Sequence, residues 1–120
     1  MAQEEFINEY IKLASYETNY ASGMSVKKHN KNLKELDLLY EQIKNDSELT
    51  KAIYKELLKN ENLKVLLYAS VDCLKLHIYI RKAKKTLKKI SKMKDIGILS
   101  LEAETCLKIY KGKYPGKSFS

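Results

Sequence analysis

Hydrophobic residues recur at three- and four-residue spacings along most of the chain, the period of helices with one apolar side. Six such stretches predict helices over 3–21, 26–45, 48–59, 63–78, 80–93 and 101–111. In the first of these, Phe6, Ile7, Tyr10, Ile11 and Ala14 share the inward side. Pro115 is the only proline, and strand-like alternation does not separate the stretches, so the sequence predicts an all-α protein.

Residues that favour helix ends lie near most of the predicted boundaries. They are Gly23 after the first helix, Asp46 or Ser47 before the third, Asn60 or Asn62 before the fourth, Ser100 before the sixth, and Gly112 after it. Short polar turns between the helices predict about six helices in three antiparallel hairpins, stacked as a HEAT-like α-solenoid; a compact helical bundle is the alternative. The length fits a single helical domain over 1–112, followed by a short C-terminal tail over 113–120.

The predicted helix over 63–78 is apolar on nearly all sides, which favours a central, packed position. One polar stripe remains on it within about 80° of arc at helical spacing. Its residues are Lys64, Tyr68, Asp72, Lys75 and Tyr79. Because tyrosine is enriched in protein interfaces, the stripe predicts a partner-binding surface; the simpler alternative is that its tyrosines cover a neighbouring helix.

Charge is divided unequally between the two halves of the chain. The net charge is +8, but residues 1–61 hold 9 basic and 11 acidic side chains, whereas residues 62–120 hold 14 and 4. Eight of the basic side chains fall within 81–94, a run without an acidic residue. The C-terminal half therefore predicts a strongly basic surface.

That basic run has the pattern of an amphipathic helix. Ala83, Leu87 and Ile90 fall on one side. The basic surface opposite consists of Arg81, Lys82, Lys84, Lys85, Lys88, Lys89 and Lys92. Like-charged neighbours at helical spacing cost about 0.2–0.5 kcal/mol per pair, so an anionic partner would relieve this helix. A solvated face without a ligand is the alternative, since the chain holds 22 lysines and a single arginine.

Several segments resemble a bacterial family of small HEAT-like helical domains of unknown function. They are 57–65, Ala69, Ala83, Leu87, 97–104, Leu107 and Gly112, with Asn30-Lys31 and Leu39-Tyr40 similar to its N-terminal half. Leu66 stands where such repeats often have arginine. The resemblance implies a HEAT-like fold and a binding role, and it carries over no catalytic residue.

Residues for catalysis, metal binding or transport to another compartment are sparse. His29 and His77 belong to no metal-ligand motif, and Cys73 and Cys106 lie in apolar helical stretches typical of buried thiols in a reducing cytosol. We therefore expect no enzyme, metal or cofactor. The acidic N-terminus lacks a signal peptide, and charged residues interrupt the apolar stretch 63–80, so we expect a cytoplasmic protein that does not enter a membrane.

These features predict a non-enzymatic protein-binding module, used by bacteria as an immunity protein or antitoxin that binds and blocks a toxin. The partner docks on the Tyr68 and Tyr79 stripe and is acidic where it meets the helix over 80–93. The alternative is a non-specific nucleic-acid-binding protein that uses 81–94. The chain has a single arginine, which argues against nucleic-acid binding, because bidentate contacts to phosphates and bases favour arginine over lysine.

Overall fold

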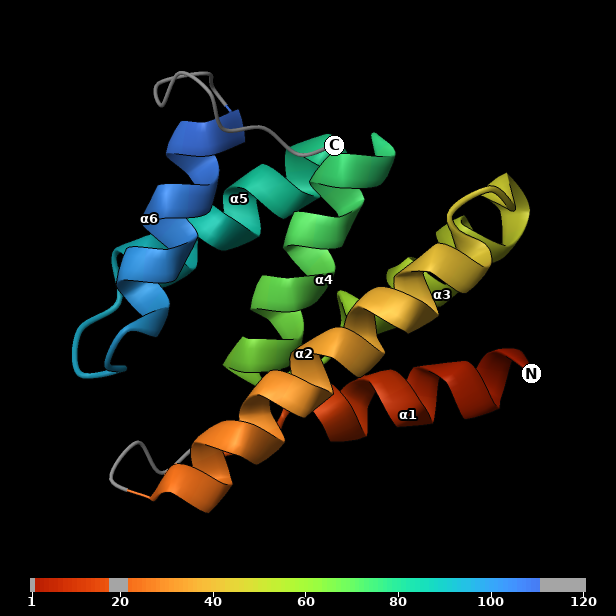
Figure 1. The fold of residues 1–120 in the computed structure, drawn as a ribbon. Helices are drawn as coiled ribbons and strands as arrows, with labels where there is room; N and C mark the ends of the chain where they lie inside the picture. The colour runs from red at the N-terminus through yellow and green to blue at the C-terminus, as the bar shows by residue number, and fades with distance from the viewer. Residues whose placement is uncertain (1, 18–21, 111–120) are drawn as a thin grey trace. The chain divides into compact units, whose positions relative to one another are not determined.

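Six α-helices account for most of the residues that the computed structural model describes, 2–17 and 22–110. They are α1 (Gln3–Ala14), α2 (Gly23–Ile43), α3 (Ser47–Leu57), α4 (Leu63–Leu76), α5 (Ile80–Ser91) and α6 (Leu99–Tyr110) (Figure 1). No strand occurs within these ranges. The prediction of an all-α protein with six helices is confirmed, whereas the predicted tail over 113–120 lies outside the described residues.

The helices form two compact units, Met1–Leu57 and Leu58–Ser120. In the first unit α1 packs against both α2 and α3. Its core includes a chain of aromatic rings, with the Phe6 and Tyr10 centroids 6.5 Å apart and the Tyr54 ring edge-on to Tyr10 at 6.0 Å. All three side chains are at most 2% exposed, so this cluster joins α1 to α3.

The second unit consists of α4, α5 and α6, each in contact with the other two (Figure 1). Val65, Ala69, Cys73 and Leu74 of α4, Ala83, Leu87 and Ile90 of α5, and Ala103 and Leu107 of α6 are all buried. The small side chains of Ala69, Ala83 and Ala103 let the backbones approach closely. As a result, the basic helix α5 has neighbours on two sides and keeps one side open.

The structure resolves two predicted helix ends. The Asp46 carboxylate accepts a hydrogen bond from the Leu49 N–H (3.1 Å), so Asp46 rather than Ser47 caps α3. Asn62 caps α4, since its side-chain oxygen accepts from the N–H groups of Lys64 (2.9 Å) and Val65 (3.3 Å). Asn60 in turn accepts from the Asn62 N–H (2.8 Å) and so supports this cap.

Two other predicted ends are wrong. Gly23 does not end the first helix, which stops at Ala14; it is the first residue of α2, whose cap is Ser22, accepting from the Ser25 N–H at 3.3 Å. Ser100 lies within α6 rather than capping it, and its hydroxyl donates to the Gly97 carbonyl oxygen at 3.5 Å. The last four residues predicted for the first helix, 18–21, and Gly112 lie outside the described residues.

The turn from α4 to α5 has an unusual backbone. α4 ends at Leu76, two residues earlier than predicted, because His77 adopts a left-handed conformation with φ 58°. Tyr79 is also left-handed, with φ 47°, and is the N-cap residue directly before α5. Neither residue is glycine, so each carries a conformational cost of roughly 1–2 kcal/mol. Tyr79 therefore does not continue α4 but lies at the start of α5.

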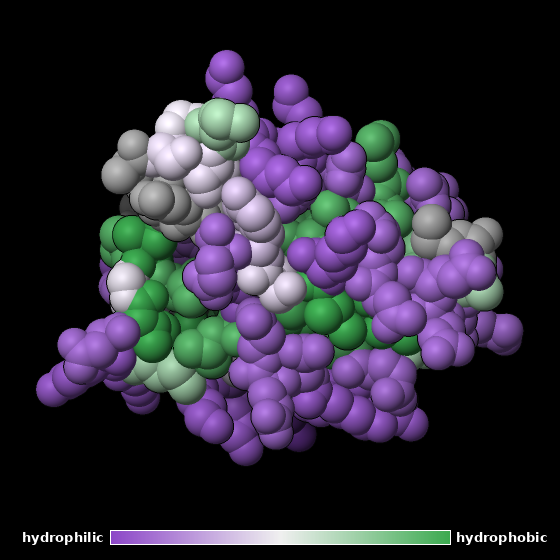
Figure 2. Space-filling model, turned by 90° about the horizontal axis from the view of Figure 1, so that it is seen from below, coloured by the Kyte–Doolittle hydropathy of each residue, from purple (hydrophilic) through white to green (hydrophobic). Residues whose placement is uncertain are grey.

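Hydrophilic side chains cover much of the molecular face in Figure 2, with smaller hydrophobic areas between them. Among the described residues, the large hydrophobic side chains that stay exposed are Met24, Leu38, Tyr79, Ile98 and Leu101. Among the described helices, none has both the length and the apolar character that a membrane span requires.

Candidate functional site

The fifth helix, α5, divides sharply into a buried and a charged side. Ala83, Leu87 and Ile90 are at most 1% exposed, because they pack into the core of the second unit. Residues on either flank of that side, Lys84 and Thr86, are half-buried. The remaining basic side chains therefore emerge on the side of the helix opposite the core.

Six of the seven residues predicted for the basic surface are exposed. They are Arg81, Lys82, Lys85, Lys88, Lys89 and Lys92, and we call them the basic face of α5. Lys84 differs, because its Nζ atom lies 4.8 Å from the centre of the Tyr110 ring on α6. A cation at this distance is attracted by the ring, so Lys84 ties α5 to α6 rather than presenting a free charge.

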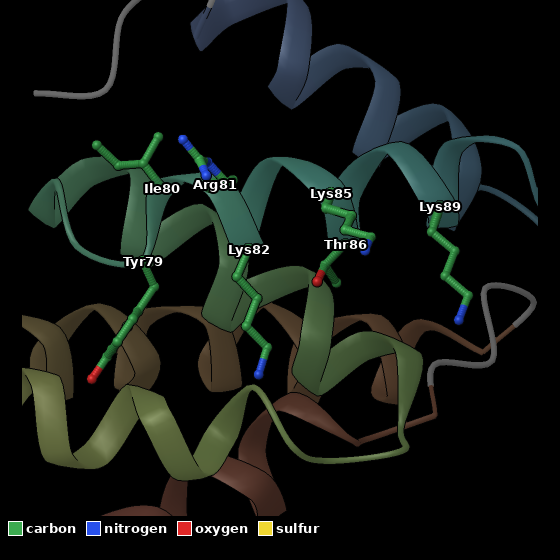
Figure 3. A pocket seen from close by; sticks show the side chains of 7 residues that line it. All are labelled: Tyr79, Ile80, Arg81, Lys82, Lys85, Thr86 and Lys89. Atoms are coloured by element: carbon green, nitrogen blue, oxygen red, sulfur yellow. The ribbon is translucent and has the colours of Figure 1, made fainter.

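Part of the basic face borders an open hollow of about 710 Å³ on the surface of the second unit. Its lining residues are Tyr79, Ile80, Arg81, Lys82, Lys85, Thr86 and Lys89. Figure 3 shows the side chains of Tyr79, Lys82 and Lys89 extending from α5 toward one side, while Ile80 and Arg81 point the other way. We call this region the α5 hollow.

The basic face has no acidic counterpart among the residues that the structure describes. None of its six side chains forms an ion pair within 4.0 Å with a described carboxylate. Other lysines do find such partners, since Lys44 meets Glu41 at 2.6 Å and Lys108 meets Glu104 at 2.9 Å. The charges of α5 are thus available to an anionic group from outside this part of the chain.

The tyrosine-containing stripe predicted on the fourth helix is divided by the structure. Lys64, Tyr68, Asp72 and Lys75 lie along α4 and are half-buried, as are the apolar Leu66 and Val71. Tyr79, at 37% exposed, lines the α5 hollow instead. Of the five residues predicted to bind a partner, Tyr79 is the one among the residues that line the α5 hollow.

Both cysteines lie in environments that disfavour the thiolate. Burial, with a smaller contribution from the Asp72 charge, raises the pKa of the Cys73 thiol to about 12. Burial, followed by the Glu102 charge, also raises the pKa of Cys106, which is half-buried. A thiolate nucleophile is scarce near neutral pH at either position.

His29 and His77 are the other residues considered for chemistry. His77 is exposed and ends α4 in the left-handed conformation. Within 2–17 and 22–110, no three His, Cys, Asp or Glu side chains come together as metal ligands. The arrangement that α5 does offer is a row of cations beside a tyrosine.

Two hollow residues, Ile80 and Thr86, were not among the predicted site residues. On a helix, Thr86 falls beside Lys82 and Lys89, so the spacing alone contained the signal for its position. Tyr79 was predicted on the wrong helix, because the sequence around the α4–α5 turn has neither glycine nor proline to mark the break.

Comparison of the chain with models of protein families, with curated proteins and with solved structures finds no match. The resemblance to small HEAT-like domains therefore stays a prediction.

Proposed function

We propose that the protein is a non-enzymatic binding module that recognises an acidic surface of a partner protein through the basic face of α5. The observation that carries this proposal is the set of six exposed cations along one helix, none of them in an ion pair with a described carboxylate. Like-charged neighbours on a helix are unfavourable by about 0.2–0.5 kcal/mol per pair. An acidic partner converts this repulsion into attraction.

An acidic protein is favoured over nucleic acid by the composition of the face. Arg81 is its only arginine, and it points away from Tyr79, Lys82 and Lys89 (Figure 3). Lysines bind phosphates as point charges and give mainly non-specific, salt-sensitive binding, whereas arginine provides the paired hydrogen bonds that hold phosphates and bases. The exposed Tyr79 ring adds a contact of the kind that protein interfaces prefer.

A toxin is the partner that we propose for this module, which would then act as an immunity protein or antitoxin. Such a protein acts by covering the working surface of its target, and it needs no catalytic residue of its own. The basic face supports this role only for a toxin that is acidic where it is bound. Co-expression with a candidate toxin tests it, since growth should be restored by the wild type and not by a variant with a reversed basic face.

The general proposal is tested by capture with matched baits. Immobilised wild type, Lys85→Glu/Lys89→Glu and a control, Lys12→Glu/Lys55→Glu, are exposed to lysate of the native host. Both double variants reverse two exposed lysines, so they have the same net charge. We expect a protein retained by the wild type and the control but lost from the α5 variant.

The captured protein is then purified and its association rate measured. Because steering charges act mainly on encounter, the α5 variant should associate more slowly than the control, and the difference should shrink in high salt. Equal retention by all three baits, or equal association rates, would refute the proposal.

A further inference from the structure

The lysines of the α5 hollow are spaced along one line of the helix. Lys82, Lys85 and Lys89 fall within about 60° of arc, at intervals of three and four residues. Along the axis these intervals correspond to about 4.5 and 6 Å. A ligand that pairs with all three needs anionic groups at similar intervals on one side.

A helix offers carboxylates at this spacing, and an extended strand does not. Acidic residues at positions i, i+3 and i+7 of a helix lie on one side and span about 10.5 Å, the same length as the row from Lys82 to Lys89. In a strand, side chains on one face recur only about every 6.6–6.8 Å, so three of them span over 13 Å. The lysine row therefore matches a second helix lying alongside α5.

The surface between the charges is suited to apolar side chains. Tyr79 contributes an aromatic ring at the beginning of α5, and its left-handed backbone places it at the end of the hollow rather than on α4. On the side toward which Lys82 and Lys89 point, the Thr86 methyl group and the lysine stems complete the lining. An amphipathic helix supplies apolar groups beside its carboxylates, whereas a sugar–phosphate backbone supplies none.

We infer that the α5 hollow holds an acidic amphipathic helix of the partner, with carboxylates at positions i, i+3 and i+7 opposite Lys82, Lys85 and Lys89 and an apolar residue against Tyr79. This inference rests on the proposed function, because it specifies the acidic surface that the basic face recognises. It places the partner helix along α5, in contact with both the charges and the ring.

Two fluorescent helical peptides of identical composition test the inference by anisotropy. The matched peptide has glutamates at i, i+3 and i+7 and one leucine near the end that meets Tyr79. The isomer has its glutamates at i, i+2 and i+5, which point to different sides. With the full-length protein at about 150 mM salt, we expect the matched peptide to bind about fivefold more tightly or better.

Variants separate this inference from the proposal beneath it. Lys85→Glu/Lys89→Glu should abolish the preference for the matched peptide, and Tyr79→Ala should reduce its affinity, whereas Lys12→Glu/Lys55→Glu should change neither. Circular dichroism of each variant confirms that the helices are retained. Equal binding of both peptides, together with host capture that still depends on α5, would overturn the helical spacing and leave the proposed function standing.

A second arm addresses nucleic acid. A 20-base-pair DNA duplex is titrated under the same conditions. We expect weaker binding than that of the matched peptide at about 150 mM salt. A tighter complex with the duplex, lost in Lys85→Glu/Lys89→Glu, would overturn both the inference and the proposed function.

Discussion

Reversing the charge of Lys85 should stabilise the protein. Its neighbours at helical spacing are Arg81, Lys82, Lys88 and Lys89, all exposed and all basic. Removing four repulsive pairs at about 0.2–0.5 kcal/mol each contributes about 1–2 kcal/mol, and four new attractions of similar size bring the gain for Lys85→Glu to about 2–4 kcal/mol. Intrinsic helix propensity changes little, because lysine, glutamine and glutamate rank together.

Urea unfolding followed by circular dichroism measures this gain, with Lys85→Gln as an intermediate case. Glutamine removes the repulsion without adding attraction, so about half of the gain should remain. Lys12→Glu is the matched control: it removes a favourable charge from the last turn of α1, three residues after Glu9, and should destabilise by a few tenths of a kcal/mol. An unchanged or lower stability of Lys85→Glu, or a gain that persists unaltered in 1 M salt, would refute the electrostatic reasoning.

Four further predictions concern the second unit. Leu74→Ala should cost about 2–5 kcal/mol in urea unfolding, since Leu74 is 1% exposed; an unchanged midpoint would contradict its place in the core. His77→Gly should gain roughly 1 kcal/mol by relieving the left-handed backbone, whereas His77→Ala should not. Ser70→Ala should leave the stability unchanged or raise it by about 1 kcal/mol, because the buried Ser70 hydroxyl has no hydrogen-bond partner among the described residues; a loss of more than 1 kcal/mol would argue against this. Finally, the pKa of Cys73 is raised to about 12, so the folded state holds the thiol proton more tightly than the unfolded state does. The free energy of unfolding should therefore be steady below the ordinary thiol pKa of about 8.5 and should fall as the pH rises from there toward 12. Cys73→Ala should lessen that fall.

The periodicity of apolar residues was sufficient to predict the helices and much of the core. Ala83, Leu87 and Ile90 were assigned to the inner side of their helix and are buried in the structure. The same reasoning placed Phe6 and Tyr10 inward on α1. These predictions succeeded because the apolar residues of an amphipathic helix form one stripe, and that stripe is the side that packs against the core.

Helix ends were harder to predict, because one residue type serves several purposes. Gly23 follows Ser22, which caps α2, so a glycine interpreted as a stop is in fact at a helix start. His77 and Tyr79 adopt backbone conformations that glycine usually supplies, and nothing in their side chains announces this. Lys84 was counted with the exposed cations, since its contact with Tyr110 depends on how α5 and α6 cross.

The central claim is that the basic face of α5 binds an acidic helix. The most direct test is to identify by NMR the residues that such a helix contacts. Amide chemical shifts of the ¹⁵N-labelled full chain are recorded while the matched glutamate peptide is added. The account predicts that the largest changes cluster at residues 79–89 and vanish in Lys85→Glu/Lys89→Glu. Changes that centre on α1–α3, or that persist in the double variant, would contradict it.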